Sequence, residues 1–462
     1  MCQLPPTTRD IPPRMPVSPQ SNLTLVCVLV TIFLDMLGYG IILPVLPELI
    51  GQLSGGSVAQ AAVIGGYLVF AYSLMQFLFG PALGNLSDRF GRRPIILLAL
   101  AGLTINYTTM GFATSIVLIF IGQIIAGISG ASVATATAYI ADITPKDKRA
   151  HRFGLIGAAF GLGFIFGPVV GGLLGELGPR WPFYAAAALA AANLMFGFFV
   201  LPESLGKDKR RPFNIRRANP FGVLLNLKRN SPVVLWLLLS LGLFVLASQS
   251  FPSVWNFFTI EVLSFSSAQI GIALGTFGIG FALSQALLIG PVTKKIGEWS
   301  TVLLGMVCAA IAFTGTAFIH SEVPLYGFLI LGSLAGLAGP AINSLMSRQV
   351  ADDAQGELQG AINAVNSLAS ILGPLAATQL FSHFTQAPKH EPGYFPGAPF
   401  LGAGILVLAA AGVFIYTVRR FDLMHRPSVA KKPHVHEMGQ PGQQITPPHE
   451  ENGNGSTATD RP

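Results

Sequence analysis

Twelve apolar segments of about 20 residues, separated by short charged or turn-rich breaks, constrain this chain more than any other sequence feature. A helix needs about 20 apolar residues to cross the roughly 30 Å hydrocarbon layer of a membrane. Only 11% of the 462 residues are charged, against roughly a quarter in soluble domains, which excludes a soluble enzyme, a disordered chain and a single-span receptor. The sequence therefore predicts an all-α membrane protein with spans over residues 23–45, 59–83, 94–113, 115–141, 154–176, 181–201, 232–259, 267–290, 299–319, 324–346, 360–384 and 397–418.

The basic residues indicate which way the spans face. With both termini in the cytoplasm, all of the 28 Lys and Arg residues except Arg180 and Lys389 fall in inside segments. Cytoplasmic loops of membrane proteins carry such an excess. The pattern predicts that both ends lie inside. Topology and attraction to anionic lipid then account for the net charge of +7 without a nucleic-acid partner.

Polar stretches divide the chain into five parts. Two six-helix bundles are predicted, joined by a basic cytoplasmic linker that contains Lys207-Asp208-Lys209-Arg210-Arg211. A polar N-terminal tail precedes them, and a Pro-, Gly- and His-rich tail predicted to be disordered follows them. In chain order these parts are residues 1–22, 23–201, 202–231, 232–418 and 419–462.

No residue pattern predicts a cofactor or a catalytic site. The three cysteines, Cys2, Cys27 and Cys308, lack metal-ligand spacing. A GxxxxGK[ST] loop is absent, so ATP-driven transport is not expected, and neither a Ser/His/Asp nor an HExxH arrangement is found. His434 and His436 leave a metal-binding alternative open, but a solvated tail is favoured.

An internal repeat relates the two bundles. Sliding the chain against itself by 206 residues aligns Ile64-Gly65 with Ile270-Gly271 without a gap from the second span to the fifth. Six spans lie between the copies, so the two repeats have the same orientation in the membrane. The repeat predicts two parallel bundles with a path between them. Further aligned pairs are Gly84 and Gly290, Gly91 and Gly297, Gly130 and Gly336, Gly154 and Gly360, and Gly167-Pro168 and Gly373-Pro374.

The loop between the second and third spans carries a charge cluster between two glycines. It reads Gly84-Asn85-Leu86-Ser87-Asp88-Arg89-Phe90-Gly91-Arg92-Arg93-Pro94. Glycines let the two spans approach closely, and charges at the inner face can pair differently in two conformations. The alternative is a basic loop that only obeys the positive-inside rule. The residues predicted to form a conformational latch are Gly84, Asp88, Arg89, Gly91, Arg92, Arg93 and Asp142.

The fifth span carries small residues at near-helical spacing. Such residues make a face on which another helix packs closely, and a proline can bend the helix. For any one of these glycines, a role in helix packing alone is the alternative to a role in transport. The motif consists of Gly154, Gly163, Gly167, Pro168, Gly171 and Gly172.

These two motifs resemble those of the major facilitator superfamily. The loop matches its signature G-x-L-x-D-R-x-G-R-R, and the fifth span resembles its antiporter motif, which accompanies exporters that exchange substrate for protons. Leu34-Asp35-Met36-Leu37-Gly38-Tyr39-Gly40-Ile41-Ile42-Leu43-Pro44-Val45-Leu46-Pro47 is similar to the tetracycline/proton antiporter branch. The resemblance implies twelve helices, a proton gradient as energy source, no cofactor, a monomer and the inner membrane.

Several charged positions of the tetracycline exporters are replaced here. That branch carries an acidic residue in span 3, an arginine in span 4, a histidine in span 8 and an acidic residue in span 9. At these places the chain has Asn106, Gln123, Phe281 and Ala309. The resemblance associates the missing groups with proton movement and with the metal–tetracycline complex. The replacements argue against tetracycline itself as the substrate.

Asp35 is the one carboxylate that clearly lies inside a predicted span, away from the predicted helix ends. It lies twelve residues past Leu23, or about 18 Å along a helix that crosses about 30 Å. A charge near the midplane is costly and marks a functional site by default. Gln123 stands where a cation would hold Asp35 ionised, so burial should favour its protonated form. We therefore predict that Asp35 is the proton site, with a packing role as the alternative.

Aromatic and amide side chains are predicted to line the substrate cavity. Polar uncharged groups among rings suit an amphipathic organic molecule, including a cationic or zwitterionic one. For any one amide, a hydrogen bond between helices is the alternative. The candidates are Tyr39, Tyr72, Gln76, Asn106, Tyr107 and Gln123 in the first half, and Gln249, Trp255, Asn256, Phe257, Gln285, Asn343 and Asn366 in the second.

The sequence thus predicts proton-coupled efflux of a small amphipathic compound or drug by alternating access, and no enzymatic activity. A symporter or facilitator that imports a small metabolite is one alternative, against which the motif in the fifth span argues. A receptor or assembly protein that keeps the scaffold without transport is another. The intact loop and the buried Asp35 argue against that alternative.

Overall fold

The computed structural model describes residues 19–130, 132–145, 148–213, 232–351, 354–389 and 391–423. Within these ranges, twelve helices are long and apolar enough to cross a membrane, which confirms the predicted all-α fold and the number of spans. The first helix begins at Pro19, four residues before the predicted span. Most of both tails, much of the linker, and His434 and His436 lie outside the described residues.

The spans are built from the following helices. The first half contains α1 (Pro19–Ile42), α2 (Leu46–Ser54), α3 (Val58–Phe90), α4 (Arg92–Gly111), α5 (Ile116–Ser129), α6 (Ser132–Ile143), α7 (Arg149–Gly175) and α8 (Trp181–Val200), followed by the turn η2 (Lys207–Lys209). The second half contains α10 (Pro232–Ser248), α11 (Ser250–Leu263), α12 (Ser267–Leu283), η4 (Ser284–Leu288), α13 (Ile289–Ile296), α14 (Glu298–Ala317), α15 (Glu322–Ser333), η5 (Leu334–Leu337), α16 (Ala338–Ser347), α17 (Gln355–Thr385) and α18 (Ala398–Arg420).

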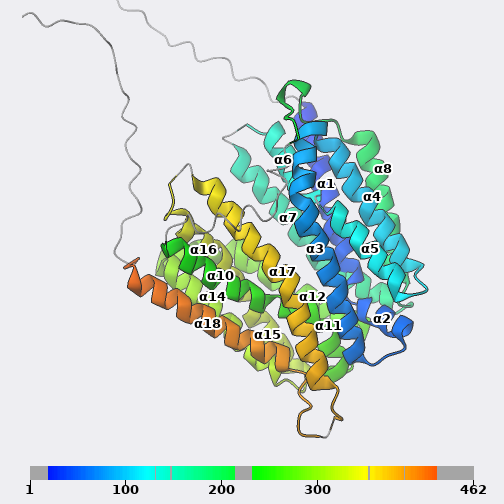
Figure 1. Cartoon of the computed structure of the whole chain (residues 1–462), viewed down its shortest axis with the longest axis vertical. Helices are drawn as coiled ribbons and strands as arrows, with labels where there is room; N and C mark the ends of the chain where they lie inside the picture. The colour runs from blue at the N-terminus through cyan, green and yellow to red at the C-terminus, as the bar shows by residue number, and fades with distance from the viewer. Residues whose placement is uncertain are drawn as a thin grey trace, which may run out of the picture.

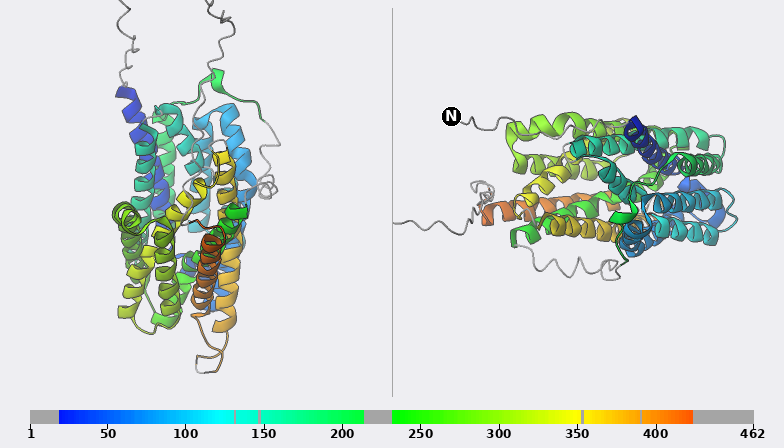
Figure 2. Two further views of the ribbon diagram at one scale, coloured as in Figure 1. Left: turned by 90° about the vertical axis from the view of Figure 1, so that its left-hand side faces the viewer. Right: turned by 90° about the horizontal axis from the view of Figure 1, so that it is seen from above.

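The two halves lie side by side as helix bundles (Figures 1 and 2). We call one end of the molecule the linker end. It carries the turns at residues 90–92 and 296–298, the ends of α6 and α16, the starts of α7 and α17, and the segment after α8. The other end, which carries α2 and the loop at 386–397, is called the seam end because the halves meet there.

The internal repeat reappears as matching helix boundaries. Ser57 and Ser266 each begin a long span with a capping box, in which the serine accepts from the backbone N–H of a glutamine three residues later. Gly91 and Gly297 each join two helices at a positive φ, 112° and 81°. Such a conformation favours glycine. Backbone geometry therefore explains this aligned pair of glycines.

Four spans are interrupted near their middles. Span 4 breaks between α5 and α6 at Gly130, and span 10 passes through the 3-10 turn η5, which contains Gly336. The repeat pairs these two glycines. Span 7 breaks at Gln249, and span 8 contains the π-helical turn η4. Irregular backbone at membrane depth is tolerated where it is buried in protein or lines a cavity. These breaks therefore mark the middle of the bundle as the place to look for a site.

The halves are joined through backbone-close contacts at the seam end. Helix α3 packs along α17, and α7 packs along α12. A Cβ atom added at Gly66 would overlap Thr378, and one added at Gly271 would overlap the carbonyl group of Pro168. The side-chain amide of Asn256 donates to the carbonyl oxygen of Leu43 across the halves at 2.5 Å.

Three of the glycines that the repeat aligns lack packing partners near the linker end. An added Cβ at Gly84 on α3, Gly154 on α7 or Gly290 on α13 would have no neighbouring atom within 4 Å. Gly66 on α3 and Gly271 on α12, by contrast, closely approach the other half.

Candidate functional site

Arg92 is the centre of the charge cluster at the linker end. Its guanidinium is 2.6 Å from an Asp88 oxygen and 3.1 Å from an Asp142 oxygen, and it donates to the Ser87 hydroxyl at 2.8 Å. The Arg92 side chain is only 13% exposed, so it needs these partners to offset the loss of water. The structure brings three predicted latch residues together: Arg92, Asp88 and Asp142.

Glu203 is a member of this cluster that the sequence reasoning missed. Its carboxylate accepts from the backbone N–H groups of Arg92 at 2.8 Å and Arg93 at 3.3 Å. These are the first residues of α4, whose N–H groups have no partners within the helix. Glu203 lies 111 residues further along the chain, and no local pattern links it to the loop. Glu203 therefore fixes the start of α4 from the segment after α8.

The remaining latch residues lie around this core. Gly91 contacts the Glu203 carboxylate so closely that a side chain would not fit. The Arg93 side chain donates to the carbonyl oxygen of Phe198 at 2.5 Å. Arg89 is exposed, with its guanidinium 5.1 Å from the centre of the Phe90 ring. Apart from Glu203, in the segment after α8, the cluster partners named here belong to the first half.

The glycines of the fifth span serve two different contacts. Gly163, Gly167 and Gly171 face α1, where an added Cβ would meet the backbone of Phe33, Gly40 or Ile41. Gly172, the next residue, faces Ser267 on α12 in the other half, while Gly154 faces open space. Pro168 lies inside α7, and its carbonyl group abuts Gly271. The motif thus binds α1 along one face and the second half along another.

Asp35 lies among three tyrosines. It is 5% exposed on α1, and it is close enough to act electrostatically on Tyr72 of α3 and Tyr107 of α4. Tyr39 interacts with the same two rings. The Tyr107 ring packs against Gly38, one turn beyond Asp35. The structure therefore gathers four of the predicted residues from three spans.

Gln76 extends this tyrosine group to the break in span 4. Its amide donates to the Tyr72 hydroxyl at 3.2 Å and to the carbonyl oxygen of Gly130 at 3.0 Å. A free carbonyl at an interrupted helix is a natural acceptor. The other two amides of this half lie apart from it: Gln123 contacts the sulfur of Met110 at 3.9 Å, and Asn106 is 3% exposed against Gly122.

The predicted residues of the second half are more dispersed. Gln249, at the break in span 7, donates to the Ser370 hydroxyl at 2.8 Å. Asn256 and Phe257 lie at the seam, where Phe257 contacts Gly65. Trp255 is 1% exposed in the hydrophobic core. The last three lie on different elements, Gln285 on η4, Asn343 on α16 and Asn366 on α17.

A row of aromatic rings crosses spans 7 and 8. The centre of the Phe251 ring lies 4.8 Å from that of Trp255 and 4.5 Å from that of Phe277, each pair tilted. The centres of the Phe277 and Phe281 rings are 5.9 Å apart. The Phe281 ring lies against Gly336 of η5 and remains 39% exposed. Phe251 and Phe277 were missed because a phenylalanine in an apolar span carries no sequence signal of its own. The two halves thus differ: the first gathers tyrosines and Asp35, whereas the second adds a row of phenylalanine and tryptophan rings to its amides.

Within the described ranges, no three or more His, Cys, Asp or Glu side chains lie close enough together to hold a metal ion. The polar groups gathered near the middle of the spans are instead tyrosine hydroxyls, amides and Asp35. Such groups can bind an organic molecule by hydrogen bonds and can hold a proton.

Comparison with known proteins identifies the family. The sequence model of the Major Facilitator Superfamily matches residues 28–374 and, in an overlapping match, residues 252–438. The chain is 41% identical over 364 residues to the tetracycline resistance protein, class C, of Escherichia coli, covering 79% of this chain and 91% of that one. It is 29% identical over 396 residues to multidrug resistance protein 2 of Bacillus subtilis (strain 168), covering 84% and 93%.

Solved structures share the fold. The human organic anion transporter MFSD10 (TETRAN) superposes with a TM-score of 0.64 at 25% identity, covering 86% of this chain and all of that one. A bacterial homologue of the human lysosomal transporter Spinster, in an inward-facing and occupied conformation, gives a TM-score of 0.68 at 16% identity over 89% of this chain.

The match spans both halves, the signature loop and the motif of the fifth span. The relatives are transport and drug-resistance proteins, which confirms the prediction of a multi-pass membrane transporter rather than an enzyme. The chain belongs to the major facilitator superfamily.

Proposed function

We propose that this protein exports a small amphipathic organic compound across the inner membrane in exchange for protons. The observation that carries the proposal is Asp35, a carboxyl group 5% exposed in the first span and surrounded by tyrosines. An ionisable group at this depth is costly to bury and marks an ion or substrate pathway. Similarity to tetracycline and multidrug resistance proteins supports a drug-like substrate.

The packing of the two halves supports alternating access. If the linker end is cytoplasmic, as the basic residues predict, the close contacts between the halves lie on the outer side in the conformation described here. The halves then rock about their middle to open the seam end. The cluster around Arg92 would stabilise one of these states.

The two unlike walls suggest the chemistry of the substrate. Tyr72, Gln76 and Asp35 in the first half offer hydrogen bonds and a carboxyl group. Phe251, Phe277 and Phe281 in the second half offer ring faces. Rings attract planar apolar groups and cations. An amphipathic compound with an aromatic face and a polar or cationic edge would match both walls.

One proton per cycle would supply enough energy for useful export. Moving one charge across 100 mV is worth about 2.3 kcal/mol. At about 1.36 kcal/mol per decade, this sustains a substrate gradient of roughly fifty-fold.

Proton release from vesicles tests the proposal. Purified protein is reconstituted in vesicles containing a pH dye, and tetracyclines, quinolones, cationic dyes and chloramphenicol-type compounds are added in turn. We expect at least one compound to drive proton movement opposite to its own, and Asp35→Asn to abolish that movement. Asp208→Asn, the same substitution on an exposed residue of η2, is the control and should behave as wild type.

Two results would contradict the proposal. Protons moving in the same direction as the substrate would indicate symport. Proton exchange that persists in the Asp35→Asn variant would show that another group couples protons to transport.

A further inference from the structure

A column of buried polar groups runs along one face of α1, from Asp35 toward the linker end. Asp35, Thr31 and Cys27 are spaced four residues apart, so they lie on the same side of the helix, each about 6 Å further along its axis. All three are at most 5% exposed. On α1, polar side chains therefore face the interior between the carboxyl group of Asp35 and the linker end.

Two other helices bring polar side chains to the level of Thr31. Asn193 of α8 is 1% exposed, and its amide donates to the backbone carbonyl oxygen of Thr31 at 3.2 Å. Cys27 is close enough to Tyr139 of α6 to act on it electrostatically. Thr135, one turn before Tyr139 on the same face of α6, is 3% exposed. Because α1 runs away from the linker end and α6 runs toward it, Thr135 lies at the level of Thr31.

Three oxygens at this level have no hydrogen-bond partner among the described residues. They are the hydroxyl oxygens of Thr31 and Thr135 and the side-chain carbonyl oxygen of Asn193, and we call these three residues the polar triad. A threonine in a helix can donate to the carbonyl oxygen four residues earlier, as Thr104 and Thr417 do at 2.8 and 2.7 Å. Buried polar atoms that bond to no protein group typically bond to an ordered water. The polar triad therefore offers three partners to a water.

The internal repeat indicates that the fold itself does not require these polar groups. It places Ala341 and Leu345 of span 10 where span 4 has Thr135 and Tyr139. In the second half, both side chains belong to or pack against a core of apolar residues. A polar group buried at membrane depth is costly and marks an ion or substrate pathway. The polar side chains of the first half therefore indicate a function rather than a packing requirement.

The column ends at the charge cluster around Arg92. The Tyr139 side chain is fully buried, and its hydroxyl donates to the backbone carbonyl oxygen of Pro202 at 2.7 Å. The charges of Glu203, the next residue, and of Asp142 both act on Tyr139. Carboxylates can accept a proton and pass it to water. The buried column thus leads from Asp35 to carboxylates at the linker end.

We propose that the polar triad binds water that relays protons between Asp35 and the linker end. Asp35 gives its proton to this water, and the water passes one of its own protons toward Tyr139, so that the water itself is unchanged. The Tyr139 hydroxyl accepts that proton and gives its own to a carboxylate of the cluster. Asp35 is then ionised, and the proton leaves from the cluster. The inference rests on the proposed function, in which Asp35 carries the proton.

Exchange of the Asp35 proton for deuterium measures the relay directly. In full-length protein held in lipid nanodiscs, the infrared band of the protonated Asp35 carboxyl group is identified as the band that Asp35→Asn removes. Its shift is followed after mixing with heavy water. We expect Thr31→Val and Thr135→Val each to slow the shift about tenfold, because one lost hydrogen bond changes the occupancy of a bound water by about that factor. Thr31→Ser, which keeps a hydroxyl, should exchange nearly as fast as wild type.

Thr417→Val is the matched control, since it removes a buried hydroxyl that bonds within its own helix. It should leave the exchange rate unchanged. The relay is refuted if Thr31→Val exchanges as fast as wild type or if Thr417→Val is slowed as much. No substrate enters the measurement, so slowed exchange in the two variants would support the relay even if no tested compound moved protons. Unchanged exchange together with substrate-driven proton movement would remove the relay and leave the export proposal standing.

Discussion

Gly91 and Gly297 occupy equivalent places in the two halves but have different surroundings. Each joins two helices at a positive φ that strains any other residue. An added Cβ would collide with the Glu203 carboxylate at Gly91, whereas nothing lies within 4 Å at Gly297. Comparing the same substitution at both glycines therefore separates the backbone strain of the turn from the steric effect of the Glu203 carboxylate.

We expect both Gly91→Ala and Gly297→Ala to lower the melting temperature, and Gly91→Ala to lower it more. Each replacement costs about 1–3 kcal/mol of backbone strain, and Gly91→Ala also displaces the carboxylate that caps α4. Tryptophan fluorescence during heating in detergent gives both values. Equal destabilisation would mean that the Glu203 contact contributes nothing.

Helix α7 shows how a single element serves both halves. Its glycines near the seam end pack on α1 and α12, and the Pro168 carbonyl lies where a side chain at Gly271 would point. Packing of this closeness between membrane helices depends on small residues. The seam is therefore intolerant of even one added methyl group.

Gly271→Ala should open the seam end. The methyl group would overlap the Pro168 carbonyl, and overpacking of this kind typically costs about 1–3 kcal/mol. The ratio of open to closed molecules should rise about five-fold or more. It is measured as the distance between two spin labels at exposed residues of the seam end, Ser54 on α2 and Val323 on α15, in full-length protein without its native cysteines. Gly327→Ala on α15, where nothing lies within 4 Å of an added Cβ, is the control. A ratio equal to wild type would show that the helices absorb the methyl group by shifting locally.

The elements themselves were predictable because their signals are local or repeated. Apolar length predicted the twelve spans, and the repeat predicted Gly91 and Gly297 at matching turns. The repeat also paired Gly130 with Gly336, although their role in interrupting spans 4 and 10 emerged only from the backbone.

The partners that complete the candidate site were not predictable from one sequence. Glu203 meets Arg92 across 111 residues, and Gln249 meets Ser370 across 121. A hydrogen bond between helices leaves no trace in the periodicity of either one. Phe251 and Phe277 look like any other apolar residue until span 7 is placed beside span 8. The sequence therefore predicted which kinds of group occur in the spans, but not their pairing.

At the scale of the whole molecule, the charge cluster lies at the opposite end from the contacts that join the halves. Asp88 and Asp142 bind Arg92 within the first half in this conformation. The cluster therefore stabilises the arrangement of α3, α4 and α6 that accompanies the close contacts at the seam end.

Asp88→Asn should lower the population of the conformation described here by about tenfold or more relative to one with a closed linker end. The substitution weakens the contact between Asp88 and Arg92 that this conformation holds, and a hydrogen bond to a charged group contributes about 1.5–3 kcal/mol. Spin labels near the linker end, at His151 on α7 and Gly356 on α17, report this population. Lys294→Gln, which removes a charge at the corresponding loop of the second half, is the comparison. An unchanged distance distribution would remove Asp88 from the latch.

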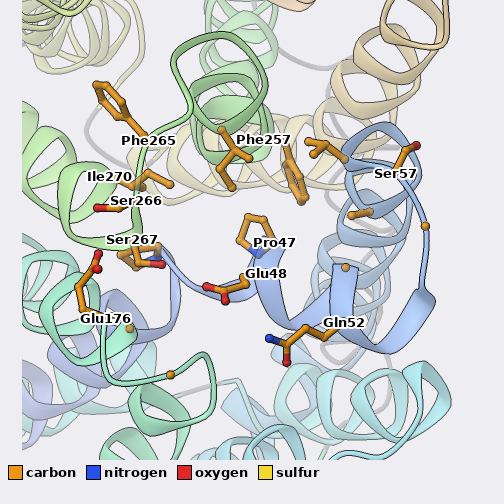
Figure 3. A pocket seen from close by; sticks show the side chains of 18 residues that line it. Pro47, Glu48, Gln52, Ser57, Glu176, Phe257, Phe265, Ser266, Ser267 and Ile270 are labelled. Atoms are coloured by element: carbon orange, nitrogen blue, oxygen red, sulfur yellow. The ribbon is translucent and has the colours of Figure 1, made fainter.

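Several contacts along the seam involve glycines. Gly172 and Gly271 approach backbone atoms of Ser267 and Pro168, whereas Gly66 approaches the Thr378 side chain. A glycine has no side-chain conformation to freeze when the halves meet or to release when they part. The seam also holds interlocking side chains, because Phe257, Phe258 and Ile270 share one buried cluster with Ile41 and Val45 of the first half. Opening of the seam end therefore requires that part of this cluster becomes exposed and that polar contacts such as the one between Glu176 (Figure 3) and Ala268 break.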